Sequence, residues 1–279
     1  MSASASVLRH PAFLRSYRFL PHRLLNRSLA MLTAASRPAW AVRAAISSWS
    51  RIEQIELDDF APGPYASLDA FFLRQLRPGA RPICSGFVAP ADGKLVASGG
   101  LTERSVLTVK GQRMSLEQIV NANRYALDIQ PYVGGAYAVV FLTPRGYHHV
   151  HMPCDGTIED VRWIPGRFYP QNETALEHIP GVYERNERAV LRVRAEAGYE
   201  FLLVLVGASL IGGIHLQGLP RSEWTRVRVT NVGQRYAKGQ RIGHFAFGST
   251  VVAVLPRGRD HLLRAGAEVR MGETLFESC

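Results

Sequence analysis

Short runs in which apolar and polar residues alternate dominate the chain from residue 83 onward. Gly and Pro separate these runs, as in GFVAPADGKLVASG, AYAVVFLTP and AVLRVRAEAG. Alternation over short stretches, with turn residues at regular intervals, is typical of antiparallel strands. We therefore expect an α+β protein that consists mainly of antiparallel β barrels or a β sandwich.

Two Pro-x-Asp-Gly turns, which contain Asp92 and Asp155, each precede an alternating strand. In such a turn Pro fixes φ, Asp binds the following backbone and Gly adopts positive φ. Lys238-Gly239 and Met271-Gly272 are comparable hairpin corners. Repeated corners of this kind are typical of flattened barrels of the lipoyl-domain type. Local sequence gives the two aspartates the same role, that of a turn residue.

Helical spacing of apolar residues occurs in two places beyond the N-terminal segment. Ser67 is expected to cap a helix that ends at Pro78-Gly79, and Ser115 a second helix that runs to Ala126. The uncharged run 201–220 is long enough to span a membrane, but four glycines interrupt it. It is better explained as two buried strands joined by a turn.

Residues 1–60 form a separate basic arm, and residues 61–279 a β-rich domain. The net charge of the chain is +10, and removing the arginines of residues 1–52, which contain no Asp or Glu, leaves +2. These eight residues are Arg9, Arg15, Arg18, Arg23, Arg27, Arg37, Arg43 and Arg51. Apolar residues at helical spacing, with Trp40 and Trp49, lie between them. This favours amphipathic helices in the interface of an anionic membrane over nucleic-acid binding. The alternatives are an arm that packs on its own domain and a transit-like leader.

Composition restricts the class of protein further. Apolar residues make up 47% of the 279 residues, as in a folded globular protein of one or two domains. The three cysteines, Cys84, Cys154 and Cys279, include no Cys-x-x-Cys pair. This argues against a disulfide framework and a zinc finger, and fits a reducing, cytosolic setting.

Three histidines lie within four residues, in the stretch Tyr147-His148-His149-Val150-His151. In a regular strand His149 and His151 share one face, and a bend before Pro153 would let His148 and His151 reach one site. Proton transfer and structural packing explain the cluster equally well. A metal site is less favoured, because Cys154 is the only soft ligand nearby. We therefore expect no metal.

Gly248-Ser249-Thr250 interrupts the otherwise apolar stretch FAFGSTVVAVL. Glycine weakens a strand and often marks a close backbone approach. The Gly-x-Ser-x-Gly elbow of a hydrolase is absent. A serine in this position can attack the carbonyl of the preceding residue, and Gly248 has no side chain to block the approach. The ester that forms can eliminate, which leaves a pyruvoyl cap on the C-terminal fragment.

The motifs, taken in order, resemble those of phosphatidylserine decarboxylases of the membrane-associated bacterial form. The resemblance rests on APADG at 89–93, YHHVHMP at 147–153, NER at 186–188, VGA at 206–208 and FGST at 247–250. Two positions depart from the family pattern: Ala89 replaces Ser or Met, and Phe247 replaces Leu. Because Phe247 keeps an apolar residue before Gly248, we expect processing to survive.

The resemblance implies roles for the matching positions. Self-cleavage between Gly248 and Ser249 would give chains 1–248 and 249–279, and Ser249 would become the pyruvoyl group. Asp92 and His151 would complete a Ser-His-Asp arrangement for this cleavage. His148 would act in decarboxylation as the proton donor. His149 falls at a variable position of the family motif, and Asp155 matches no catalytic position.

The reaction that the resemblance implies is decarboxylation of phosphatidylserine to phosphatidylethanolamine and CO2, through a Schiff base on the pyruvoyl group. This cofactor would replace pyridoxal phosphate, for which the chain offers only Lys94, Lys110 and Lys238 as Schiff-base lysines. The expected partner is phosphatidylserine in an anionic membrane. The enzyme would be peripheral, on the cytoplasmic face of the cell membrane, and a homodimer of processed chains.

Three other functions remain open. A relative of these enzymes could act on another phosphoserine lipid, such as an archaetidylserine. A membrane-surface protein could keep the fold without processing, although Asp92, His148, His151 and Ser249 are all present. A serine hydrolase that uses Ser249 directly would stay in one piece.

Overall fold

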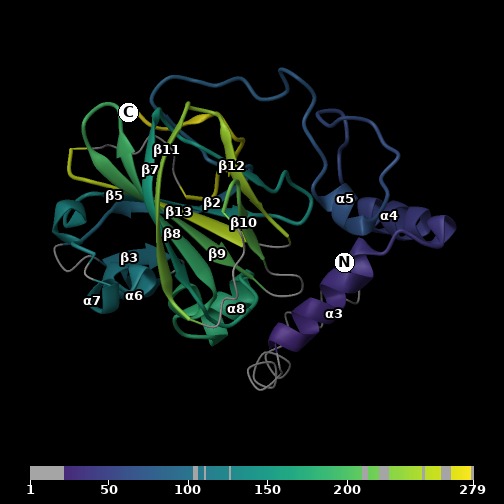
Figure 1. The fold of residues 1–279 in the computed structure, drawn as a ribbon, viewed down its shortest axis with the longest axis horizontal. Coiled ribbons are helices and arrows are strands. Elements are labelled where there is room, and N and C mark those ends of the chain that lie inside the picture. The colour runs from purple at the N-terminus through teal and green to yellow at the C-terminus, as the bar shows by residue number, and fades with distance from the viewer. Residues whose placement is uncertain are drawn as a thin grey trace.

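An eight-stranded antiparallel sheet forms the centre of the molecule (Figure 1). The structure is a computed structural model that describes residues 22–102, 106–109, 111–125, 127–208, 213–219, 226–246, 249–258 and 265–277. The order of the strands across the sheet is β11 (Arg228–Tyr236), β7 (Gly156–Ile164), β8 (Arg188–Ala195), β9 (Glu200–Gly207), β13 (Ser249–Leu255), β5 (Ala136–Leu142), β2 (Gly93–Gly100) and β14 (Glu268–Val269).

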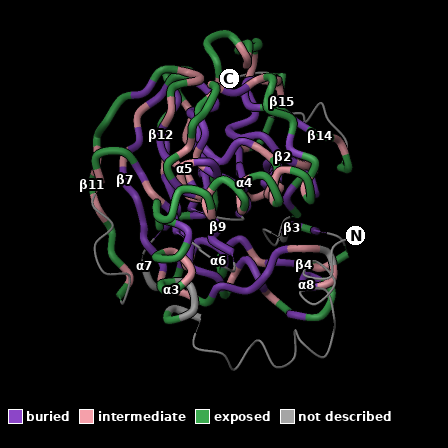
Figure 2. The backbone as a smooth tube through the Cα atoms, turned by 90° about the vertical axis from the view of Figure 1, so that its right-hand side faces the viewer, coloured by how far each residue is buried: buried purple, intermediate pink, exposed green. Residues whose placement is uncertain are grey.

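Both faces of this sheet are covered, which explains why its central strands are apolar throughout (Figure 2). In β9, Leu203 and Leu205 point into one core, whereas Leu202 and Val204 point into the other. Successive side chains of a strand point to opposite faces, so a strand that is buried on both faces shows no polar alternation. This is the physical reason for the long uncharged run noted above.

The first core lies between the large sheet and two smaller ones. These are a three-stranded sheet of β10 (Ile214–Leu216), β12 (Arg241–Phe245) and β6 (His149–His151), and the pair β1 (Phe87–Val88) and β15 (Thr274–Phe276). The Phe87 ring packs edge-on against Phe201 and Phe276, with centroids 5.2 and 5.6 Å away. The sheets therefore form a sandwich.

Short helices and a hairpin cover the second face. They contribute Leu107, Ile119, Leu176 and Val182, among others, to the second core. The elements are β3 (Val106–Val109), β4 (Gln112–Ser115), α6 (Leu116–Val120), α7 (Ala122–Tyr125), the 3-10 helix η1 (Gln130–Tyr132), α8 (Glu173–His178) and α9 (Val182–Arg185).

The predicted fold class, α+β with mainly antiparallel strands in a sandwich, is confirmed. The described strands do not close into a barrel, because β11 and β14 lie at opposite edges of an open sheet. The run 201–220 forms two strands, as predicted, but β9 belongs to the large sheet and β10 to the small one. Residues 209–212 between them lie outside the described residues.

Both predicted serine caps are present, but both predicted helices are shorter than expected. The Ser67 hydroxyl accepts a hydrogen bond from the Ala70 amide at 3.0 Å, and α5 (Leu68–Phe72) then ends well before Pro78. It ends there because residues 75–77 pair with residues 59–61 in extended conformation. Ser115 caps α6, and Asn121, with φ of 54°, ends that helix before α7 begins.

The arm contains two helices, α3 (His22–Ala34) and α4 (Ala39–Glu53), which extend from one side of the sandwich (Figure 1). Trp49 and Phe72 hold the arm to α5, with ring centroids 6.2 Å apart. Residues 1–21, with three of the arginines counted above, lie outside the described residues. None of the described helices is both long and apolar enough to span a membrane. The division of the chain at residue 60 stays a prediction.

We predict that Leu203→Ala, in the centre of β9, lowers the free energy of unfolding by about 3 kcal/mol, because truncation leaves a cavity between the sheets. Urea denaturation followed by tryptophan fluorescence measures this change. A Ser249→Ala background keeps the chain in one piece. The control is Leu24→Ala in the same background, since Leu24 is 63% exposed. Equal effects of the two substitutions would contradict the described core.

Candidate active site

The histidine stretch leads into β6, where the small sheet meets α5. The Tyr147 ring lies beside both His149 and His151, with centroids 4.7 and 5.6 Å away. These two histidines therefore share a face, as the alternation of a strand predicts. His148 instead lies against Phe72 of α5, with ring centroids 3.8 Å apart.

His148 is completely buried and is neutral. Its Nδ1 lies 3.1 Å from the Gly146 carbonyl oxygen. A carbonyl only accepts, so Nδ1 carries the proton and Nε2 keeps a lone pair. Burial, followed by the charge of Arg74, lowers the pKa of His148 to about 3. Nε2 is buried and has no hydrogen-bond partner among the described residues. The structure thus leaves a proton acceptor unused in a dry environment.

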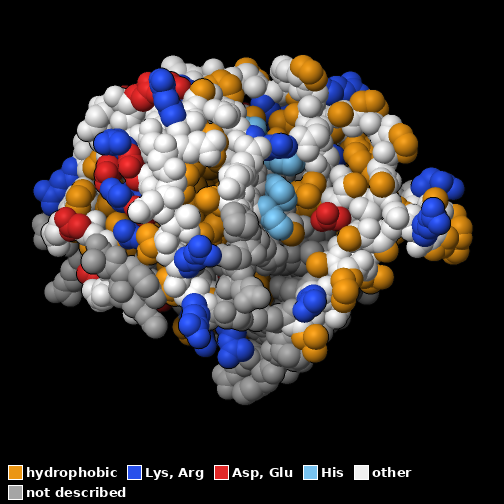
Figure 3. Space-filling model, in the orientation of Figure 1, with side chains coloured by type: hydrophobic (Ala, Val, Ile, Leu, Met, Phe, Trp, Pro, Cys, Tyr) orange, Lys and Arg blue, Asp and Glu red, His pale blue; other side chains and the backbone are white. Residues whose placement is uncertain are grey.

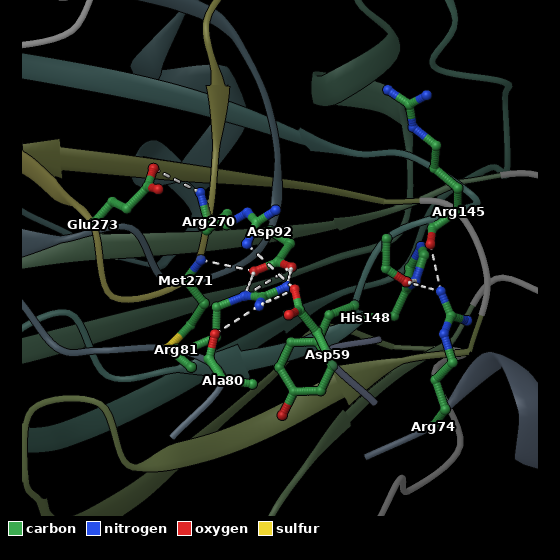
Figure 4. A network of polar contacts seen from close by, with 12 residues as sticks. Asp59, Arg74, Ala80, Arg81, Asp92, Arg145, His148, Arg270, Met271 and Glu273 are labelled. Carbon is green, nitrogen blue, oxygen red and sulfur yellow. Dashed lines mark hydrogen bonds and ion pairs between the residues drawn. The ribbon is translucent and has the colours of Figure 1, made fainter. Parts of the chain in front are cut away.

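The charge beside His148 comes from Arg74, whose guanidinium is almost completely buried. It lies 4.3 Å from the centre of the Phe60 ring and donates to the carbonyls of Arg145 and Gly146 (Figure 4). Burial lowers the pKa of Arg74 to about 10, so the group stays charged at neutral pH. Arg74 thereby ties the segment after α5 to the loop before His148.

His151 has a partner at each ring nitrogen. Nδ1 donates to the Gly239 carbonyl at 2.8 Å, and Nε2 accepts from the Tyr147 hydroxyl at 2.9 Å. Gly239 has φ of 76°, which favours glycine, so the predicted hairpin corner also holds this imidazole. Burial lowers the pKa of His151, and the nearby Asp92 carboxylate opposes that shift.

Asp92 lies at the first Pro-x-Asp-Gly turn, and it is more than a turn residue (Figure 4). Arg81 donates to both carboxylate oxygens, from Nη2 at 2.6 Å and from Nε at 3.1 and 3.2 Å. The Met271 amide donates to Oδ1 at 2.8 Å. Asp92 therefore acts on His151 through its charge, and its hydrogen bonds go to these other groups. By contrast, the Asp155 carboxylate accepts from the Lys238 amide and holds a hairpin corner.

Ser249 is the first residue of β13, between Leu142 of β5 and Gly207 of β9. Its hydroxyl is completely buried and has no hydrogen-bond partner among the described residues. Buried polar groups are nearly always paired, so an exception marks a candidate functional atom. Phe247 and Gly248 lie outside the described residues.

The strand ends around Ser249 are fixed by buried amides. Thr250, on the opposite face, donates to Gln171 at 2.7 Å, and Gln171 donates to the Gly207 carbonyl at 2.9 Å. Asn186 also donates to this carbonyl at 2.9 Å. The NER and VGA motifs therefore meet at the N-terminal end of β13. Sequence reasoning missed Gln171, because glutamine carries no motif of its own.

Histidines also gather on the outer face of the small sheet, in the hollow seen in Figure 3. His215, His244 and His149 lie in register across β10, β12 and β6. The rings of His215 and His244 stack with centroids 4.7 Å apart. Burial lowers the pKa of His149 and that of His244 to about 4. In the part of the chain that the structure describes, no group of three or more His, Cys, Asp or Glu could hold a metal ion.

Comparison with known proteins decides the family. The family model for phosphatidylserine decarboxylase matches residues 68–277. The chain belongs to this family. A phosphatidylserine decarboxylase proenzyme of Azotobacter vinelandii is 32% identical over 95% of this chain and 98% of its own length. The corresponding proenzyme of Pseudomonas fluorescens strain Pf0-1 has the same identity and coverage, and that of Psychrobacter arcticus is 31% identical over 92% of this chain.

Membership of this family makes the chain an enzyme, a decarboxylase, and confirms the resemblance read from the motifs. The matched range includes Asp92, His148, His151 and Ser249, and begins at α5. The structure adds three residues that the motifs did not assign: Arg74, Arg81 and, as the partner of His151, Tyr147. The catalytic roles themselves stay predictions.

We predict that the free energy of unfolding falls as the pH drops from about 6.5 to about 4, where unfolded histidines bind protons and the buried ones do not. Urea unfolding of the Ser249→Ala chain, measured at several pH values, gives the slope. His149→Gln should reduce that slope by up to about 1.4 kcal/mol per pH unit. The control is His178→Gln, because His178 is exposed. Equal slopes in both variants would contradict the prediction.

Proposed function

We propose that this enzyme decarboxylates phosphatidylserine to phosphatidylethanolamine and CO2, with a pyruvoyl group that the chain makes from its own Ser249. Family membership supports the substrate, since the relatives are named phosphatidylserine decarboxylase proenzymes. The word proenzyme in those names fits a chain that is processed before it acts.

One observation carries the proposal: the buried, unpartnered hydroxyl of Ser249 at the first position of a central strand. A serine that only filled space there would leave a polar group unpaired at a cost of about 1–3 kcal/mol. A serine that is converted to another group has a reason to be kept. The residue before it is Gly248, which leaves the scissile carbonyl open to attack.

Self-cleavage would proceed in three steps. The Ser249 hydroxyl loses its proton to His151, Oγ bonds to the carbonyl carbon of Gly248, and the C–N bond breaks as the amine takes up a proton. Loss of the Cα proton of residue 249 then breaks the Cβ–Oγ bond and releases chain 1–248 with a free carboxylate. Water replaces the nitrogen, which leaves as ammonia.

His151 and Asp92 suit the first step. Because His151 Nδ1 donates to Gly239, Nε2 is the basic nitrogen, and Tyr147 now occupies it. The Asp92 charge favours the protonated imidazole that forms when Ser249 loses its proton. The Ser-His-Asp arrangement thus needs Nε2 to exchange Tyr147 for Ser249.

The residues around Ser249 fit a pyruvoyl group, because a buried hydroxyl without partners can be replaced by a carbonyl without loss of a hydrogen bond. When formed, this group supplies an electron sink for decarboxylation. His148 is proposed to move the proton: its free Nε2 takes one from the ammonium of the substrate and returns it to the carbon that loses CO2.

The arm is proposed to hold the enzyme on the cytoplasmic face of the membrane as a peripheral protein. Figure 3 shows apolar and basic side chains side by side on the arm. Leu24, Met31, Leu32 and Trp40 are each 63–68% exposed, and α4 has no buried residue. Helices with exposed apolar residues among arginines bind the interface of anionic bilayers. Phosphatidylserine is itself an anionic lipid of such a bilayer.

We predict that the purified protein consists of two chains that end and begin at Gly248 and Ser249. The small chain should be lighter than its sequence by one ammonia, as measured by the mass of the denatured protein. The control is Ser249→Ala, which removes the nucleophile and should stay in one piece. A wild-type chain that stays intact contradicts self-processing and favours a serine hydrolase or an inert membrane protein.

The same preparation tests the substrate. Phosphatidylserine in mixed vesicles should be converted to phosphatidylethanolamine with release of CO2, and Ser249→Ala should be inactive. Faster turnover of an archaetidylserine would favour the related lipid instead.

We predict that Trp40→Ser lowers binding to vesicles of phosphatidylserine and phosphatidylcholine by about tenfold, because burial of one large apolar side chain contributes about 1.5–3 kcal/mol. Co-sedimentation of the Ser249→Ala chain measures the binding. The control is Val229→Ser on β11, which removes an exposed apolar residue far along the chain from the arm. If both variants lose the same affinity, the arm is not the membrane contact.

A further inference from the structure

Arg81 makes more hydrogen bonds to carboxylates than any other arginine described in Figure 4. Its side chain is only 6% exposed, and that of its main partner, Asp92, is 11% exposed. Three of its donor contacts go to Asp92, and Nη1 donates to Asp59 at 2.7 Å. A nearly buried guanidinium that meets two carboxylates has a defined geometry, since its planar fork fixes where both must lie.

Three separate parts of the chain meet at this guanidinium. Asp59 follows the arm, Asp92 lies in the turn before β2, and Met271, which donates to Asp92, follows β14. Arg270 adds a contact to Asp59 at 3.3 Å. Arg270 and Met271 belong to the segment 249–279, which becomes the small chain under the proposed function. Arg81 therefore connects the base of the arm, the turn and this segment.

Asp92 needs such a partner to act through its charge. A carboxylate that is removed from water holds its proton more tightly unless a cation or hydrogen-bond donors compensate. The Met271 amide supplies one donor, and Arg81 supplies the charge. A neutral Asp92 could not favour the protonated form of His151, which is the form that self-cleavage creates.

We propose that Arg81 is a positioning residue for self-cleavage: it keeps Asp92 ionised and oriented toward His151. This inference rests on the proposed function, because it gives Asp92 a part in cutting the chain before Ser249. Arg81 itself touches neither Ser249 nor His151 among its described contacts; it acts through Asp92.

The geometry also separates Arg81 from its neighbour Arg77. Arg77 is exposed, and its Nε donates to the backbone carbonyl of Phe60. Both arginines follow α5 and carry the same charge at similar positions in sequence. Only Arg81 binds Asp92, so Arg77 is a matched control for a general loss of positive charge.

The test measures the rate of self-cleavage at different pH values. The full-length chain is made in a cell-free translation reaction, pulse-labelled, and chased in buffers from acid to alkaline pH. The fraction of cleaved chain is followed by gel electrophoresis. The variants are Arg81→Met, Arg81→Lys and Arg77→Met.

We expect Arg81→Met to shift the rising limb of the pH profile upward by about one to three pH units, the usual effect of an arginine beside an aspartate. At neutral pH this makes cleavage at least about tenfold slower, with recovery at alkaline pH. Arg81→Lys keeps the charge but loses the fork, so its profile should lie between those of the wild type and Arg81→Met. Arg77→Met should behave as the wild type.

The outcomes are distinguishable. A wild type that cleaves, with an Arg81→Met profile of unchanged midpoint, overturns the inference and leaves the proposed function intact. Slow cleavage of Arg81→Met at every pH also overturns it, because a merely structural role predicts that result. A wild type that never cleaves overturns the proposed function and this inference with it. If Arg81→Met fails to fold, as judged by circular dichroism, the midpoint of Arg81→Lys decides.

Discussion

The position of β13 in the sheet is the constraint on which the site depends. This strand is paired with β5 on one edge and β9 on the other, and both of its faces are covered. Its first residue therefore lies in a rigid and dry place, with little freedom in where the Ser249 hydroxyl can point. Reactive groups on packed strands are held more accurately than groups on loops, because neighbouring side chains fix them. The amides of Gln171 and Asn186 complete this support.

Electrostatics adds a second layer of organisation. The histidines near the site are kept neutral by burial, whereas the arginines around them stay charged. Arg74 and Arg81 both come from the segment after α5, which is also where the arm joins the sandwich. The segment thus brings two cations to the histidine stretch and to Asp92. A surface helix pair and the interior of the sandwich share one connecting segment, so a disturbance at either end reaches the other through few residues.

Local sequence predicts the local features well. Alternation gives the strands, Ser67 and Ser115 mark the helix starts, and glycine marks the hairpin corner at Gly239. The motifs bring Asp92, the histidines and Ser249 to notice. What sequence could not supply is the set of long-range pairings. The early end of α5 comes from pairing of residues 75–77 with residues 59–61, and the role of Arg81 comes from partners on both sides of it in sequence. An arginine followed by proline carries no signal of either.

The central location of β13 also affects how the protein could be made and lost. The precursor folds as one polypeptide, so β13 finds its place between β5 and β9 in a unimolecular reaction. Once the chain is cut before Ser249, the same strand belongs to a separate polypeptide that remains in the middle of the sheet. After denaturation the two pieces would have to find each other again, in a second-order and concentration-dependent process. The mature enzyme would then depend on slow unfolding rather than on an equilibrium with its unfolded chains, which is kinetic stability.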